Sequence, residues 1–383
     1  MTLNLLSPTY LSDKLEPISL WLTIGFIGAL VINLLVTLFL CKQNMAKVAK
    51  SSVISLLFYS LVLGILLLVA EILKKYDSAY LEKNWVNEDV VKFVFIPVLV
   101  TLFLSLIGGI TLFIIAKKKP TAFKIVLYSL IGLVGVGLVV CVILISIFYS
   151  QNIYGDGYYT GEYGKLNSLA LYICAGVLIA LVVALTFIIG RKNKTPFNTR
   201  AIALAGVCTA ISFALSYIKF EAVWLQGGSI TLVSFLPICL YSYIYGMKKG
   251  LLVGLIYGML QAIQDPFIVH PAQFLLDYPI AFSMITMSGL LTDLGVMENL
   301  PRLKFTLGAI FTGTFRYVAH VISGVFAFGA YAMDAEATNF LIFSAGYNSY
   351  VFVDIALVIV VGVIILSSKS FRKEINKLNP TNN

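Results

Sequence analysis

The chain is poor in charge and in the residues that carry most enzyme chemistry. Only 12% of its 383 residues are charged, 60% are hydrophobic, and the mean hydropathy is +0.95. Soluble domains average about 25% charged residues, so this composition excludes that class and indicates an integral membrane protein. The sequence has only two histidines, His270 and His320, and it shows neither a Ser/His/Asp set nor an HExxH run. We therefore expect no enzyme, no catalytic residue, no metal site and no cofactor.

The cysteines and glycines also lack the patterns of known sites. The five cysteines are scattered through or beside apolar runs without paired spacing, which supports neither a disulfide framework nor a zinc site: Cys41, Cys141, Cys174, Cys208 and Cys239. The pair Gly164–Lys165 is no phosphate loop, because no glycine stands five residues before it and Leu166 replaces the Ser or Thr that would hold Mg²⁺. ATP hydrolysis is therefore expected on partner proteins.

Long apolar runs are what the sequence has in abundance. A helix rises 1.5 Å per residue, so about 20 residues cross a hydrocarbon layer of about 30 Å, and only the run at 250–264 is short for this. The runs lie at 19–40, 53–73, 93–116, 125–148, 167–190, 201–219, 229–246, 250–264, 272–292, 305–332 and 346–367. We predict an all-α polytopic membrane protein with about eleven transmembrane helices.

The Lys and Arg residues are concentrated in the loops on one side of these runs. With the N-terminus placed outside, the inward loops hold most of the 27 Lys and Arg residues, for example at 117–124 and 191–200. Cytoplasmic loops of membrane proteins carry this excess of Lys and Arg. The pattern predicts an outward N-terminus and an inward C-terminus in the cell membrane. The net charge of +9 is then explained by the basic cytoplasmic loops, and we expect no nucleic acid as a partner.

The basic segment RKNKTPFNTR at 191–200 divides the chain into two halves. We predict a five-span extension of unknown role at 1–190, a cytoplasmic linker at 191–200, a six-span domain at 201–370 and a cytoplasmic tail at 371–383. Ionisable side chains are almost absent from the first five runs but recur in the last three. Such groups are costly at bilayer depth unless they are paired or face a cavity, so function is expected in the second half.

Four polar groups of this half are predicted to meet near the outer surface. Asp277 and Tyr278 lie about one and a half turns into the run 272–292, His320 lies in the outer half of the next run, and Asn348 opens the last one. Trp224 and Phe267 stand in outward loops that we expect to close over these groups.

A carboxylate, an imidazole, an amide and aromatic rings suit a small, flat, cationic or amine-bearing ligand. Structural alternatives stay open at this stage. In the first alternative, Asp277 forms a buried ion pair with Arg316. In the second, His320 only packs against its neighbours. In the third, Asn348 only makes a hydrogen bond between helices. Asp354 is interpreted as a helix–helix contact outside the pocket.

The run 201–219 carries small residues four apart, a pattern that lets another helix approach closely. These are Ala201 with Ala205 and Gly206 with Ala210. The pattern predicts a face for a partner helix, although packing within the chain explains it equally well.

Several motifs of the second half give the chain a family resemblance. These are GGSITL before Pro237, MKKG at 247–250, DPFIVHPAQFLLDYPIAF at 265–282, HVISGV at 320–325 and YNSY at 347–350. From about residue 197 to 370 the chain resembles the thiamine-specific substrate-binding subunits, the S components of the ThiT family, of energy-coupling factor (ECF) transporters. Residues 1–190 lie outside this resemblance.

The resemblance implies a six-helix S component that captures thiamine from outside and docks on a transmembrane coupling protein carrying two cytoplasmic ATPases. It implies that Asp277 engages the cationic and amino groups of thiamine, with Tyr278, His320 and Asn348 in the pocket and Phe328 stacking on the ligand. Gln273 and Tyr347 lie in the same motifs and complete the predicted set. The small-residue face at 201–210 is implied to meet the coupling protein.

The resemblance leaves the ligand and the mode of transport open. Phe267 and Phe343 stand where members of the family carry tyrosines, so the ligand is thiamine, a phosphorylated form or its pyrimidine fragment. Two rival functions remain. One is a self-sufficient, proton-coupled transporter of thiamine or a related vitamin, and the other is a membrane sensor of thiamine.

Overall fold

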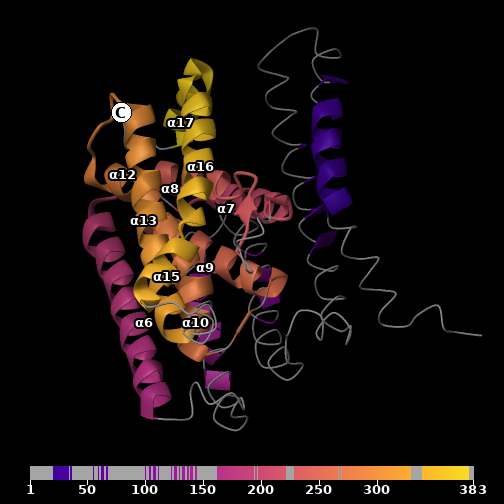
Figure 1. The fold of residues 1–383 in the computed structure, drawn as a ribbon. Helices are drawn as coiled ribbons and strands as arrows, with labels where there is room; N and C mark the ends of the chain where they lie inside the picture. The colour runs from indigo at the N-terminus through magenta and orange to yellow at the C-terminus, as the bar shows by residue number, and fades with distance from the viewer. Residues whose placement is uncertain are drawn as a thin grey trace, which may run out of the picture.

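The computed structural model describes the chain mainly beyond residue 160. The described residues are 20–33, 35–36, scattered positions between 55 and 144, 162–193, 195, 197–220, 228–265, 267–268, 270–328 and 339–378. Nearly all of them are helical. In Figure 1 the long helices α6, α13 and α16 run alongside one another, with α13 packed against both of the others.

Beyond residue 160 the described residues form a succession of helices with one short strand pair among them. They are α6 Glu162–Ile189, η2 Gly190–Lys192, α7 Thr199–Leu215, β1 Lys219–Phe220, β2 Ile230–Thr231, α8 Leu236–Tyr245, α9 Met247–Gln264, α10 Pro271–Leu275, η3 Leu276–Ile280, α11 Ala281–Ser283, η4 Met284–Gly289, α12 Leu290–Leu294, α13 Pro301–Ala327, α15 Phe340–Tyr347, α16 Tyr350–Ser367 and α17 Lys369–Leu378. Another helix, Leu20–Asn33, lies in the first half of the chain.

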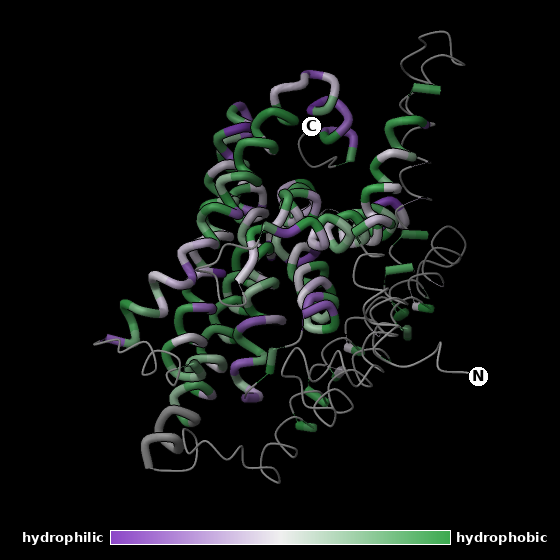
Figure 2. The backbone as a smooth tube through the Cα atoms, turned by 45° about the vertical axis from the view of Figure 1, so that its right-hand side comes forward, coloured by the Kyte–Doolittle hydropathy of each residue, from purple (hydrophilic) through white to green (hydrophobic). Residues whose placement is uncertain are grey.

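Four helical stretches are long and apolar enough to cross a membrane. They are Leu169–Ile189, Pro271–Leu294, Pro301–Ala327 and Phe340–Ser367. In Figure 2 green hydrophobic residues alternate with white and purple ones along the helices. The helical membrane class is therefore confirmed. The number of eleven spans and the orientation stay predictions.

The structure changes the start of one expected run. Residues 229–246 were expected to be one helix, but β1 and β2 form a short antiparallel pair with Lys219 opposite Thr231 and Phe220 opposite Ile230. Helix α8 begins only at Leu236 and has Pro237 in its first turn. Proline fits there because the first N–H groups of a helix have no intrahelical acceptor.

The run 272–292 forms one continuous helical stretch that changes its winding. Pro279 lies inside η3, a turn of π-helix, where its missing N–H cannot donate to the preceding turn.

Two glycines of α9 let this stretch pack closely against that helix. A Cβ on Gly258 would lie 2.7 Å from the backbone oxygen of Tyr278, and one on Gly254 would lie 2.7 Å from that of Phe282. Backbone contact with α9 thus fixes the height of Asp277 and Tyr278.

Two clusters of buried side chains form the core. The larger one joins α7, α8, α9, α13 and α16, with Phe235 stacked on Phe282 at 5.6 Å and Tyr257 edge-on to both. The smaller cluster joins α6 to the helices from α10 to α13. Helix α6 therefore belongs to the same packed body as the helices that follow it.

The expected linker at 191–200 is also bound to these helices. Asn193 Nδ2 donates to Asp293 Oδ1 at 2.5 Å and to the backbone oxygen of Tyr245 at 3.2 Å. The buried Lys249 Nζ donates to the backbone oxygen of Thr195 at 2.8 Å. The division of the chain at this segment stays a prediction, but the segment itself is attached to both α9 and α12.

Candidate functional site

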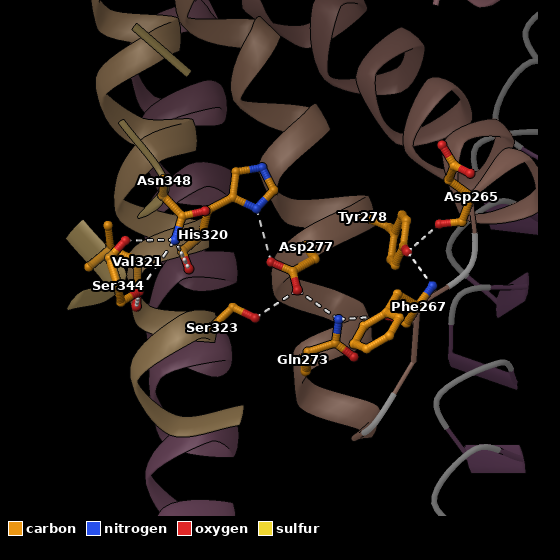
Figure 3. Close-up of polar contacts among 10 residues, drawn as sticks. All are labelled: Asp265, Phe267, Gln273, Asp277, Tyr278, His320, Val321, Ser323, Ser344 and Asn348. Carbon is orange, nitrogen blue, oxygen red and sulfur yellow. Dashed lines mark hydrogen bonds and ion pairs between the residues drawn. The ribbon is translucent and has the colours of Figure 1, made fainter. Parts of the chain in front are cut away.

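The carboxylate of Asp277 is the centre of a polar cluster between η3 and α13 (Figure 3). Its Oδ2 accepts hydrogen bonds from Gln273 Nε2 and from Ser323 Oγ, each at 2.7 Å. Its Oδ1 lies 2.9 Å from His320 Nδ1. The Asp277 side chain keeps 16% of its surface exposed, so the cluster fixes the carboxylate without closing it off.

Helical spacing brings these donors to one carboxylate. Gln273 stands four residues before Asp277, so the two side chains lie on one face of the α10–η3 stretch. His320 and Ser323 are three residues apart and share a face of α13. Because α13 packs against η3, both α13 side chains reach the same carboxyl group.

His320 has one ring nitrogen left for another molecule. An ionised carboxylate only accepts hydrogen bonds, so His320 Nδ1 carries the hydrogen that faces Asp277. In the neutral ring Nε2 is then an acceptor. This buried atom has no hydrogen-bond partner among the residues that the structure describes. A ligand N–H or O–H group would satisfy it.

Asn348 lies at the junction of α15 and α16, beside this cluster, and mainly holds neighbouring helices together through hydrogen bonds. Its Nδ2 donates to the backbone oxygen of Ser344 at 2.9 Å and to that of His320 at 3.3 Å. Close packing surrounds it, since a Cβ on Gly324 would lie 2.1 Å from Ser344 Oγ. The amide therefore makes the interhelical hydrogen bond that was one of the alternatives for this residue, while it lies next to His320.

Tyr278 anchors the segment that precedes α10. Its hydroxyl donates to the backbone oxygen of Asp265 at 2.6 Å and accepts from Phe267 N at 2.7 Å. Phe267 is 39% exposed, and its ring centroid lies 5.6 Å from that of Phe328. Gln273 Nε2 donates to the backbone oxygen of Phe267 at 3.0 Å, which ties this aromatic pair to the Asp277 cluster.

The remaining predicted residues are Tyr347, Trp224 and the small residues of α7. The ring of Tyr347 packs edge-on against Tyr350 at 6.2 Å, beside Gly228. Trp224 lies outside the described residues. On α7, Ala201 is fully buried, Ala205 and Ala210 are half-buried, and Gly206 is exposed with open space around it.

Arg316 does not pair with Asp277, and that alternative is wrong. Its Nη1 donates to Asp354 Oδ2 at 3.0 Å, and its guanidinium lies 4.2 Å from the ring centroid of Phe235. Asp354 Oδ1 also accepts from the backbone N–H and the hydroxyl of Thr231. Asp354 is therefore a helix–helix contact, as expected. The charge of Asp277 is left without a lysine or arginine partner among the described residues.

Sequence reasoning missed Ser323. A serine in an apolar helix gives no strong signal of its own. Its position three residues after His320, on the same helical face, was the signal that could have identified it.

Comparison with known proteins places the whole Asp277 cluster in a region shared with vitamin transporters. A family described as thiamine transporter protein (Thia_YuaJ) matches residues 202–375. The thiamine transporter ThiT of Bacillus subtilis (strain 168) is 36% identical over 165 residues, which are 41% of this chain and 84% of that protein. The thiamine transporter ThiT of Lacticaseibacillus paracasei is 29% identical over 175 residues, which are 42% of this chain and 83% of that protein. Helix α6 precedes the matched stretch.

Proposed function

The chain belongs to this thiamine transporter family, and from that premise we propose that it captures thiamine for uptake as the S component of an ECF transporter. The observation that carries the proposal is the Asp277 carboxylate, which is oriented by three donors, partly exposed and without a lysine or arginine partner among the described residues. Thiamine carries a permanent positive charge on its thiazolium ring, so a fixed carboxylate is complementary to it.

The other groups of the cluster supply contacts that fit the rest of the molecule. The Phe267 and Phe328 rings offer faces for stacking and cation–π contact with a flat cation. His320 Nε2 offers an acceptor for the amino group of the pyrimidine ring. Tyr278, Gln273 and Asn348 hold these groups in place, and Tyr347 and Trp224 complete the proposed site.

The proposal includes the expected topology and partners. We infer about eleven spans in the cell membrane, with the N-terminus outside and the C-terminus inside. The proposed regions are the extension 1–190, the linker 191–200, the thiamine-binding domain 201–370 and the tail 371–383. ATP hydrolysis is assigned to two cytoplasmic ATPases on a coupling protein, which meets the small-residue face of α7 near Gly206.

Binding of thiamine to the purified full chain tests the proposal. Tryptophan fluorescence and calorimetry should both show saturable binding below micromolar ligand. Competition by thiamine phosphate and by the free pyrimidine fragment then identifies the preferred form. If both methods detect no saturable binding at micromolar thiamine, the proposal fails.

A second function, self-sufficient transport, is favoured by one observation on α7. Thr23 Oγ1 of the helix Leu20–Asn33 donates to the backbone oxygen of Ala214 at 3.5 Å, and Leu22 and Phe26 pack against the cluster that contains α7. The first half of the chain thus contacts the helix that is proposed to meet the coupling protein. Uptake of labelled thiamine by cells with and without the coupling module separates the two functions. Loss of uptake without the module supports the S component, and full uptake without it supports self-sufficient transport.

A further inference from the structure

Helix α6 packs on the helices of the Asp277 cluster although it precedes residues 202–375, the stretch that the family match covers. Leu171, Ala175, Leu178 and Val182 form a buried stripe at helical spacing. Residues on other faces of α6 are exposed, including Ile173 at 56% and Val177 at 60%. One face of α6 is therefore committed to the bundle.

This stripe of α6 packs against the α10–η3 stretch, which carries Asp277. Its partners in the smaller core cluster include Ala272 and Leu276, both fully buried, and Ala319 of α13. Ala272 directly precedes Gln273, and Leu276 directly precedes Asp277. The α6 contact and the Asp277 cluster thus lie on neighbouring faces of the same two helical turns.

A ring contact extends this packing to the first residue before α10. The rings of Tyr172 and His270 lie 5.0 Å apart between centroids, tilted by 59°. His270 is almost completely buried, and its Nδ1 accepts a hydrogen bond from Ala272 N at 3.1 Å. That bond caps α10, since the first N–H groups of a helix have no partner within it.

Helix α10 needs this support because it is only five residues long and runs directly into a π-turn. A short helix with an irregular continuation gains little from its own backbone hydrogen bonds. Its position depends on the cap and on the side chains packed against it. Gln273, which donates to Asp277, is the third residue of α10.

We propose that α6 is an integral seventh helix of the thiamine-binding unit and that Tyr172 is a positioning residue, which holds His270 and thereby the start of α10 and the Gln273–Asp277 pair. The expected effect on thiamine affinity rests on the proposed function. The packing of α6 and the contact of Tyr172 with His270 do not depend on it. It links the N-terminal region directly to the affinity of the binding site.

Three variants of the full chain test the positioning role. Tyr172→Leu removes the ring at similar apolar bulk, Tyr172→Phe keeps the ring, and Ile173→Leu changes an exposed neighbour as a matched control. An aromatic pair is worth a factor of about 2 to 12 in an equilibrium constant. We expect Tyr172→Leu to weaken thiamine binding by about that factor, with wild-type affinity in the other two variants.

A double-mutant cycle shows whether the effect passes through His270. His270→Asn keeps a capping oxygen but removes the ring. If Tyr172 acts on His270, combining Tyr172→Leu with His270→Asn adds no further loss of affinity beyond that of His270→Asn. Fully additive losses would overturn the proposed route.

Hydrogen exchange without ligand keeps this test separate from the proposed function. Amides of 272–277 should exchange faster in Tyr172→Leu than in Tyr172→Phe, while amides of α16 stay unchanged. Wild-type exchange and wild-type affinity in Tyr172→Leu would overturn the inference. A wild-type chain that binds no thiamine, but shows the exchange difference, would refute the function and leave the positioning role of Tyr172 intact.

Discussion

At the scale of single residues, the site depends on how one carboxylate is held. The Asp277 carboxylate is hydrogen-bonded by Gln273, Ser323 and His320, which come from two helical stretches and together fix its orientation. None of these three is a lysine or arginine, and no other lysine or arginine of the described residues forms an ion pair with the carboxylate. This is the electrostatic arrangement that a cation-binding site requires.

Ser323 is expected to contribute to affinity by orienting this carboxylate. Ser323→Ala removes one of two hydrogen bonds to Asp277 Oδ2. Ser323 acts on the ligand only through Asp277, so we expect an effect no larger than that of an ordinary hydrogen bond, about 0.5–1.5 kcal/mol, which weakens thiamine binding by about 2- to 12-fold. Calorimetric titration measures the change, with the exposed Ser367→Ala as control. Unchanged affinity in Ser323→Ala would show that the remaining donors suffice.

His270 gives the protein a dependence of stability on acid. Burial lowers the pKa of His270 from 6.5 to about 4. Between these values the unfolded chain binds a proton that the folded chain does not, so stability should fall as the pH drops from about 6.5 to 4. His270→Asn should show a smaller loss of melting temperature over this interval. Parallel losses in both proteins would assign the acid sensitivity to other groups.

At the scale of elements, a buried ion pair joins three parts of the fold. Arg316 of α13 binds Asp354 of α16, and Asp354 binds Thr231 of β2. The sequence offered Asp277 as a partner for Arg316 and predicted Asp354 as a separate helix–helix contact. It could not show that Asp354 of α16 lies closer at that depth, because this depends on how two helices cross.

Breaking this pair should destabilise the protein strongly. Arg316→Met leaves the Asp354 charge buried without its partner, which costs about 3–5 kcal/mol. Adding Asp354→Asn removes that charge and keeps an oxygen for Thr231, so the double variant should recover much of the stability. Thermal unfolding in detergent measures both. A double variant less stable than Arg316→Met would contradict this account.

At the scale of the whole molecule, the sequence predicted the helical class and the meeting of Asp277, His320 and Asn348. Long apolar runs and the rarity of polar groups within them carry that information. The packing of α6 was not predicted, because its buried residues are as apolar as its exposed ones and leave no amphipathic pattern. The π-turn at Pro279 and the strand pair before α8 also depend on tertiary packing.

The central claim is that the charge of Asp277 binds the positive charge of thiamine. The most direct measurement compares thiamine with a neutral isostere, in which carbon replaces the thiazolium nitrogen, for binding to the wild type and to Asp277→Asn. We expect the wild type to bind thiamine at least about tenfold more tightly than the isostere, and Asp277→Asn to lose most of this preference. An equal preference in both proteins would show that the Asp277 charge does not bind the thiazolium charge.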